Sequence, residues 1–367
     1  MCCEENNFTS LTNYSVRYQG REDNNCPDSV MTFQTFKSVD RTVCCGLIPC
    51  LFVVGVPANI LNMIIFYRQG LRDRMNLCLF CLAFIDLMFL IVLIIGVSFC
   101  FIGFFLPKQE QFWRWILTRH TVNFAYGFVH SSGCLTMIIA VERWVCVMFP
   151  MKAATLISRK TMAIIVSLTL LLMQLLCGVY IVKEHILSVK DEVTGEYLVV
   201  SVLTDLYLSY SFFRIIENVV LSFISFFTFA CVLLATAATV IQLHTAQSWR
   251  KSTASSHMKG QGMLMRMLVA MSCVYILCTA PNMALGLARF TVPEFRADGS
   301  FCNLFIATHM LSVLIIMFNS SINFFVYAAM SSRFRQELKA LFSWTEAGMS
   351  LKTSISVTHI KHSSDSL

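Results

Sequence analysis

The sequence predicts an all-α membrane protein: a seven-transmembrane helix bundle followed by a short amphipathic eighth helix. Three observations predict this fold. Hydrophobic residues make up 56% of the 367 residues and charged residues only 13%, whereas a soluble domain carries about 25% charged residues. The apolar residues gather in long stretches, each able to cross about 30 Å of hydrocarbon as a helix. The polar segments between them alternate in charge, as the loops of a multi-pass protein do.

The predicted spans follow from the apolar stretches in chain order. Each must be a helix, because a segment in lipid has to satisfy its own backbone hydrogen bonds, and barrel strands would be about ten residues long. The expected spans are 42–67, 77–101, 115–147, 161–182, 212–243, 263–287 and 305–329. This division gives an N-terminal tail (1–41), a seven-transmembrane domain (42–330), an amphipathic helix (331–343) and a C-terminal tail (344–367).

Loop charge predicts the orientation. The loops after the first, third and fifth spans and the C-terminal tail carry more basic than acidic residues, and the other polar segments carry the reverse. Basic loops stay in the cytoplasm, so we expect a plasma-membrane protein with its N-terminus outside. Two Asn-x-Ser/Thr sequons, at Asn7 and Asn13, predict glycosylation of that outer tail.

Several classes of function are excluded by what the sequence lacks. No Cys/His pattern has zinc spacing, and no nucleophile elbow, phosphate loop or His-Glu-x-x-His motif occurs, so we expect neither a metal centre nor an enzyme. The net charge of +7 is spread along the chain and does not indicate nucleic-acid binding. Most of the 16 cysteines lie in apolar runs, where cysteine acts as a small hydrophobe, among them Cys44, Cys45, Cys50, Cys78, Cys81 and Cys134.

Polar residues deep in apolar helices form recognisable motifs. Asp86 stands in Leu82-Ala83-Phe84-Ile85-Asp86 in the second span, and Asn59 stands in the first. The third span ends in Glu142-Arg143-Trp144, followed by Pro150. Burying such groups in a membrane is costly, so they are expected to face the bundle interior and to be functional. For Arg143 alone, the alternative is snorkelling toward lipid headgroups.

The last two spans add further motifs. The sixth contains Tyr275 and the run Cys278-Thr279-Ala280-Pro281, in which the proline would kink the helix. The seventh contains Asn319 and, four residues on, Asn323-Phe324-Phe325-Val326-Tyr327. A basic amphipathic stretch follows, typical of a helix that lies in the membrane interface.

These motifs, in this order, resemble those of rhodopsin-like G-protein-coupled receptors over residues 43–342. The resemblance implies an extracellular ligand, a heterotrimeric G protein as cytoplasmic partner, and an arrestin-like protein that binds a phosphorylated C-terminal tail. It also implies two states, with Arg143 paired to Glu142 at rest and the sixth span swinging about Pro281 on activation. The residues implied in coupling and activation are Glu142, Arg143, Tyr275, Pro281, Asn323 and Tyr327.

The departures from the family pattern narrow the classes of ligand that the receptor could bind. Thr118 stands where the family usually has a cysteine in helix three. Residues 183–211, where the family has the partner cysteine of that bridge, contain no cysteine. Ala125 stands where amine receptors have an aspartate. The overall sequence pattern most resembles that of gastropod mollusc chemosensory receptors and invertebrate neuropeptide receptors. This resemblance implies a chemosensory cue or a small peptide as ligand. A transporter or channel that uses Asp86 for ion passage is the alternative of a different class.

Two clusters of side chains are candidate sites. A sodium-type site is expected at Asp86, Ser132, Asn319 and Asn323, with an ion-free polar cluster as the alternative; no other cofactor is expected. A ligand pocket that opens outward is expected among the mixed charges of Arg119, His120, Asn123, Arg214, Glu217 and His309. Arg214 and Glu217 are three residues apart on one helix, so they could instead pair with each other.

The extracellular cysteines predict a disulfide between Cys26 and Cys302. The resemblance makes the first and seventh spans neighbours, and exposed thiols pair in an oxidising compartment. The alternatives are a Cys2–Cys3 bridge, or Cys26 paired with Cys2 or Cys3.

Overall fold

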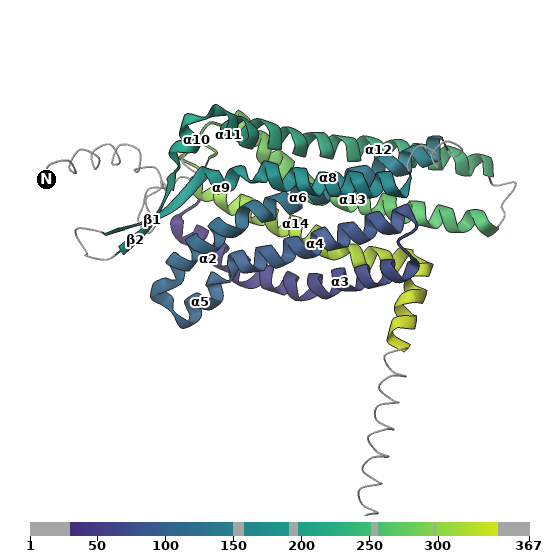
Figure 1. Ribbon diagram of the computed structural model, residues 1–367, viewed down its shortest axis with the longest axis horizontal. Helices are drawn as coiled ribbons and strands as arrows, with labels where there is room; N and C mark the ends of the chain where they lie inside the picture. The colour runs from purple at the N-terminus through teal and green to yellow at the C-terminus, as the bar shows by residue number, and fades with distance from the viewer. Residues whose placement is uncertain (1–29, 150–157, 191–196, 251–255, 297–298, 344–367) are drawn as a thin grey trace, which may run out of the picture.

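The computed structural model describes residues 30–149, 158–190, 197–250, 256–296 and 299–343. Within them, seven helices are long and apolar enough to cross a membrane, which confirms the predicted fold class. Figure 1 shows these helices side by side as one elongated bundle. A β-hairpin projects from one end of the bundle, and the C-terminal helix turns away from the bundle axis at the other (Figure 1).

The first half of the chain builds the first four spans. The first span runs through α2 (Phe33–Thr42), the π-helical turn η1 (Val43–Leu47) and α3 (Ile48–Gln69). The span begins nine residues before its predicted start. The prediction stopped short of the charged residue Asp40, but in the structure Asp40 is buried in an ion pair and lies within the helix. The next spans are α4 (Arg74–Val97) with its extension α5 (Phe99–Phe105), η2 (Pro107–Gln109) with α6 (Glu110–Met148), and α8 (Arg159–Cys177) with α9 (Val179–Lys183).

The second half begins with an antiparallel hairpin that the helix patterns did not predict. Strand β1 (Glu184–Lys190) pairs with β2 (Tyr197–Leu203) in the register Glu184↔Leu203. The short helix α10 (Asp205–Ser209) comes next, and the fifth span follows as α11 (Ser211–Ile215), η3 (Ile216–Val220) and α12 (Leu221–Arg250). The sixth and seventh are α13 (Ser256–Thr291) and α14 (Cys302–Met330), and a helix over 332–343 comes last.

The core is divided along the bundle axis. One apolar cluster lies where helix 332–343 joins the bundle, and it includes Leu79, Ile139, Met267, Tyr327 and Phe334. We call this the Arg143 end, after the residue of α6 near it. A second cluster lies toward the hairpin end, where α2, β1 and β2 lie, and it includes Val43, Phe89, Leu90, Phe99 and Met317. Large apolar side chains such as Leu175 and Leu277 remain exposed, as lipid-facing residues do.

Candidate functional site

Asp86 forms a polar cluster in the middle of the bundle. Its side chain, fully buried on α4, accepts hydrogen bonds from Ser132 Oγ at 2.9 Å, Ser320 Oγ at 3.0 Å and Asn323 Nδ2 at 3.0 Å. The cluster therefore joins α4, α6 and α14 through one carboxylate. Such a carboxylate in hydrocarbon requires several donors, because burying it unpaired is very costly.

The cluster differs from the predicted one at one position. Ser320 bonds to Asp86, and Asn319 is not among the donors. Residues three and four apart share one face of a helix, so the spacing from Asn323 allowed either residue and could not decide between them. Ser320 also joins a second contact, because its carbonyl accepts from Asn59 Nδ2 of α3 at 2.9 Å.

Glu142 is the centre of the Arg143 end. Its side chain is 1% exposed, and its two carboxylate oxygens have different partners. Oε2 pairs with the guanidinium of Arg143, the next residue of α6. Oε1 lies 2.9 Å from Nε of Arg74, the first residue of α4. The sequence motif predicted the first pair, and nothing in the motif pointed to Arg74.

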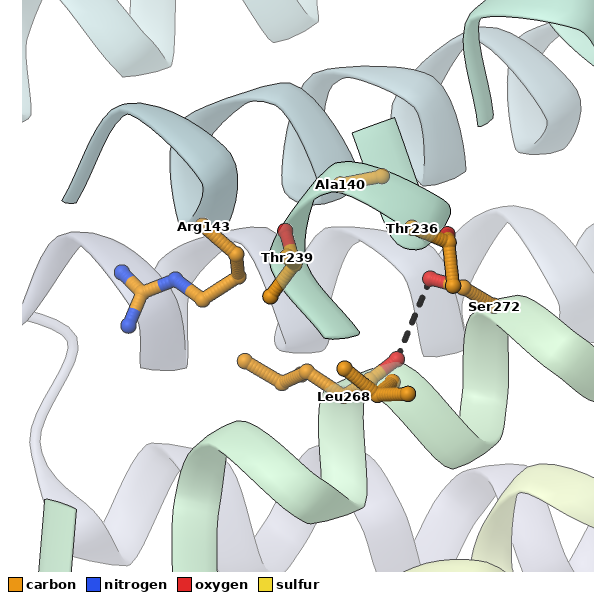
Figure 2. A pocket seen from close by; sticks show the side chains of 7 residues that line it. Ala140, Arg143, Thr236, Thr239, Leu268 and Ser272 are labelled. Carbon is orange, nitrogen blue, oxygen red and sulfur yellow. Dashed lines mark hydrogen bonds between the residues drawn. The ribbon is translucent and has the colours of Figure 1, made fainter. Parts of the chain in front are cut away.

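A small cavity lies beside Arg143, between α6, α12 and α13. Its volume is about 10 Å³, close to the least that holds one water molecule. Thr236 Oγ1, on this cavity, is buried without a hydrogen-bond partner, whereas Ser272 Oγ donates to the Leu268 carbonyl. The guanidinium of Arg143 points away from Thr236 and Ser272 (Figure 2). The lining residues are Ala140, Arg143, Thr236, Thr239, Leu268, Val269 and Ser272.

The other residues implied in activation occupy separate packing sites. Tyr275 of α13 is 8% exposed, and its hydroxyl lies over Gly133 of α6, where a Cβ would come within 2.9 Å of it. Pro281 lies inside α13. Tyr327 is buried against the ring of Phe66, with centroids 5.0 Å apart, and against Phe334 of the C-terminal helix.

The ligand candidates at the hairpin end do not form one cluster. Arg119 of α6 holds the backbone where α9 leads into the hairpin: its Nε donates to the carbonyl of Glu184, the first residue of β1, at 2.9 Å and its Nη2 to the Ile181 carbonyl at 2.5 Å. His120 is exposed and Asn123 is buried. His309 Nε2 lies 2.8 Å from the hydroxyl of Tyr126.

Glu217 has partners that its sequence neighbours did not indicate. It accepts from Lys183 Nζ at 2.7 Å and from the Tyr207 hydroxyl at 2.5 Å. Burial and the neighbouring Glu217 carboxylate raise the pKa of Tyr207 well above its usual value, so the phenol remains a donor. Arg214 bonds to Ser211 Oγ instead, so the expected alternative of an Arg214–Glu217 pair is wrong. Glu217 therefore pairs with Lys183 of the preceding span and not with Arg214, the cation three residues away on its own helix.

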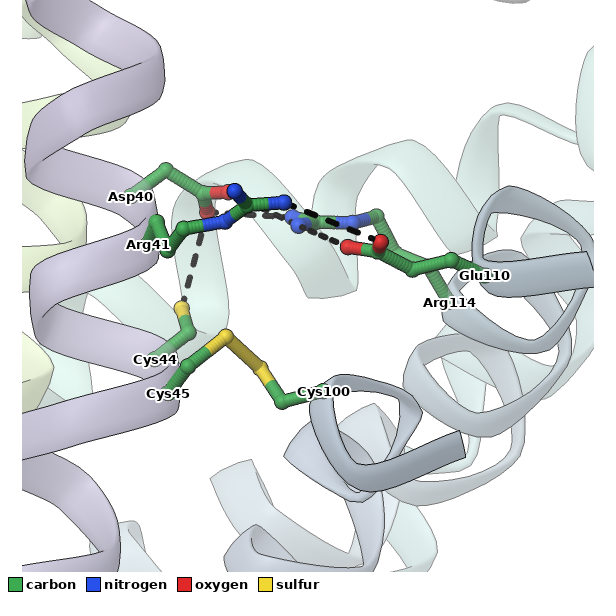
Figure 3. The surroundings of a disulfide bond; sticks show 7 residues. All are labelled: Asp40, Arg41, Cys44, Cys45, Cys100, Glu110 and Arg114. Carbon is green, nitrogen blue, oxygen red and sulfur yellow. Dashed lines mark hydrogen bonds and ion pairs between the residues drawn. A yellow bond between two sulfur atoms is a disulfide. The ribbon is translucent and has the colours of Figure 1, made fainter. Parts of the chain in front are cut away.

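A disulfide and an ion pair tie the first three spans together at the hairpin end (Figure 3). Cys45 of η1 is bonded to Cys100 of α5, with Cα atoms 5.5 Å apart. Nearby, Asp40 accepts from both terminal nitrogens of Arg114, at 3.0 and 2.8 Å. The interpretation of Cys45 as a small hydrophobe is therefore wrong. The chain order held a signal: Cys45 lies near the start of one span and Cys100 near the end of the next, so antiparallel packing places both at the same end.

The predicted extracellular bridge is only half within the described residues. Cys302 is 1% exposed and disulfide-bonded. Cys26 lies outside the described residues, as do Cys2, Cys3, Asn7 and Asn13, so the Cys26–Cys302 pairing and the glycosylation sites stay predictions.

Comparisons with known proteins bear on this arrangement. The family model described as "7 transmembrane receptor (rhodopsin family)" matches residues 35–327. Human proteinase-activated receptor 2 is 22% identical over 320 residues, which cover 85% of this chain and 75% of the relative. The same receptor from cattle is 22% identical over 297 residues, which cover 79% of this chain and 69% of the relative. The family match spans all seven membrane helices.

Proposed function

Because the chain belongs to the rhodopsin family of seven-transmembrane receptors, we propose that it carries a signal from an extracellular ligand, bound at the hairpin end, to a heterotrimeric G protein at the Arg143 end. Its family and relatives are signalling receptors and not enzymes. The same family match argues against the alternative of a transporter or channel.

The proposed orientation puts the N-terminus and the hairpin outside the plasma membrane. The support is the excess of Lys and Arg in the loops and tail at the opposite, Arg143 end. The G protein, and an arrestin-like protein that recognises a phosphorylated C-terminal tail, would then bind at the Arg143 end. That tail, 344–367, lies outside the described residues.

The buried Glu142–Arg143 pair carries the proposal. At rest the pair holds the guanidinium of Arg143 on Glu142, at the edge of the cavity between α6, α12 and α13. Activation would move the part of α13 before Pro281 outward, enlarge this cavity, and release Arg143 toward the G protein. The ligand supplies the driving force, since shifting such an equilibrium from one state to the other requires up to about 5.5 kcal/mol of preference for the active state.

The proposed ligand is a chemosensory cue or a small peptide, with a neuropeptide as the alternative. Cationic, anionic and aromatic side chains occur at the hairpin end, in the Lys183–Glu217 pair and the Tyr126–His309 contact, and such a mixture suits a zwitterionic or peptide ligand better than an apolar one. The relatives are named for activation by a proteinase, so a proteinase is a second trigger to be tested.

A sodium ion at Asp86 is a further proposal. The Asp86 carboxylate, the hydroxyls of Ser132 and Ser320 and the amide oxygen of Asn323 are the hard oxygen ligands that such a cation prefers. The hydrogen bonds that Ser132, Ser320 and Asn323 donate to Asp86 also support the ion-free alternative. Asp86→Asn is expected to abolish any sodium dependence of signalling, and unchanged sodium sensitivity would favour the ion-free cluster.

The experiment is a screen of the full chain in cells that express a promiscuous G protein. Small polar cues, peptides and proteinases are applied separately, and G-protein activation and ion flux are recorded in the same cells. We expect activation without ion flux. Arg143→Ala should abolish it, and Arg68→Gln, a substitution in a partly exposed ion pair with Glu337 at the same end, should retain it. Ion flux without G-protein activation would overturn the proposal.

A further inference from the structure

Arg74 has a contact that the receptor motif does not assign. The Nε of Arg74, on α4, lies 2.9 Å from Glu142 Oε1, while Arg143 occupies Oε2. Cys146 joins the same group, since its Sγ lies 3.3 Å from Arg74 Nη2 and 3.4 Å from Glu142 Oε1. The buried carboxylate thus has one guanidinium on each oxygen.

The local structure fixes Arg74 in this place. Asp73 caps α4 by accepting from the Met75 amide at 3.1 Å. Asn76 donates to the carbonyls of Gln69 and Gly70, which closes the turn between α3 and α4. A cation in the first turn of a helix opposes the helix dipole, so Arg74 gains nothing from its own helix. Its position is stabilised by Glu142.

We propose that Arg74 is a positioning residue that keeps Glu142 ionised when Arg143 is released, so that activation proceeds without proton uptake. The inference rests on the proposed function. If Arg143 were the sole partner, its departure would leave a buried, unpaired carboxylate, which is strongly unfavourable and would drive Glu142 to its neutral form. With Arg74 on Oε1, the charge of Glu142 stays paired in both states.

The surroundings of Glu142 allow this assignment. Among the described residues, Arg74 and Arg143 are the basic groups within 4 Å of its carboxylate. Within the described part of the chain, the other titratable groups that interact with it are Cys146 of its own helix and Cys78 of α4. Arg159 and Lys160, at the start of α8, form no ion pair with it.

The substitution Arg74→Gln removes the second charge and leaves an amide. The active state of this variant would bind one more proton than its resting state, so its active fraction is expected to rise as pH falls. The dependence approaches tenfold per pH unit for one coupled proton. Arg74→Lys keeps the charge and is expected to show no such dependence, and the double variant Arg74→Gln/Glu142→Gln has no carboxyl left to titrate.

The test uses the full chain in lipid nanodiscs with a purified promiscuous G protein. Basal nucleotide exchange is measured between pH 6 and 8 and divided by the wild-type value at each pH, which cancels the pH response of the G protein. The ratio for Arg74→Gln is expected to fall with rising pH and the ratio for Arg68→Gln to stay constant. A constant ratio for Arg74→Gln would overturn the proposal.

If Arg74→Gln does not fold, the wild type can be compared with Glu142→Gln instead. Glu142→Gln lacks the carboxyl, so the ratio of wild-type to Glu142→Gln activity is expected to be the same at every pH. A ratio that falls as pH rises would mean that the wild type takes up a proton and would contradict the proposal. Exchange in no variant, including the wild type, would instead refute the proposed function.

Discussion

The two ends of the bundle are held together in different ways. At the hairpin end, a disulfide joins Cys45 to Cys100 beside the two-bond ion pair of Asp40 with Arg114, and Arg119 donates to backbone carbonyls, which carry no charge. At the Arg143 end, one buried carboxylate is shared by two guanidinium groups, beside a cavity with an unpartnered hydroxyl. Covalent and backbone contacts fix a geometry, whereas a shared ion pair can exchange partners. The hairpin end is therefore built to hold its shape and the Arg143 end to change it.

The covalent link is expected to give the largest effect on stability. Cys100→Ser opens a loop with a sequence separation of 55, and the loss of chain restriction corresponds to about 4 kcal/mol. Surface expression and the thermal midpoint of the purified protein should both fall. Cys50→Ser, at an exposed free cysteine of α3, is the matched control. Equal stability of the two variants would remove the disulfide from the comparison.

Arg119 is expected to give the next largest effect. Arg119→Ala removes charge-assisted bonds to the carbonyls of Ile181 and Glu184, each worth about 1.5–3 kcal/mol. Hydrogen exchange of the amides in β1 should speed up while exchange in α4 stays unchanged. The control is His120→Ala, an exposed neighbour on the same helix. Unchanged exchange in β1 would show that the hairpin is held by its other contacts.

Thr236 is expected to give the smallest effect. Thr236→Val replaces a buried hydroxyl without a partner by a methyl group, so the protein should be unchanged or more stable by up to about 1 kcal/mol. Thr239→Val loses the 2.7 Å hydrogen bond that the Thr239 hydroxyl donates to the Ala235 carbonyl, so this variant should not gain stability. A thermal midpoint lowered by Thr236→Val alone would indicate a water-mediated bond in the cavity.

The sequence predicted the fold well because membrane helices are coded locally, by length and apolarity. It also predicted the contacts of Asp86 with Ser132 and Asn323, since both lie at motif spacing on helices whose depth is known. It did not predict Arg74 on Glu142, Lys183 on Glu217 or the Cys45–Cys100 bond. Each of these joins side chains from different spans, and their rotation about the helix axes is set by packing that no single stretch of sequence contains.

The Glu142–Arg143 pair is expected to keep the Arg143 end in its resting state. The most direct measurement is basal G-protein activation by Glu142→Gln, normalised to surface expression. Loss of the pair should raise basal activity about tenfold, the change that corresponds to about 1.4 kcal/mol between the two states. Basal activity at or below the wild-type level, in a variant that reaches the surface, would contradict the account.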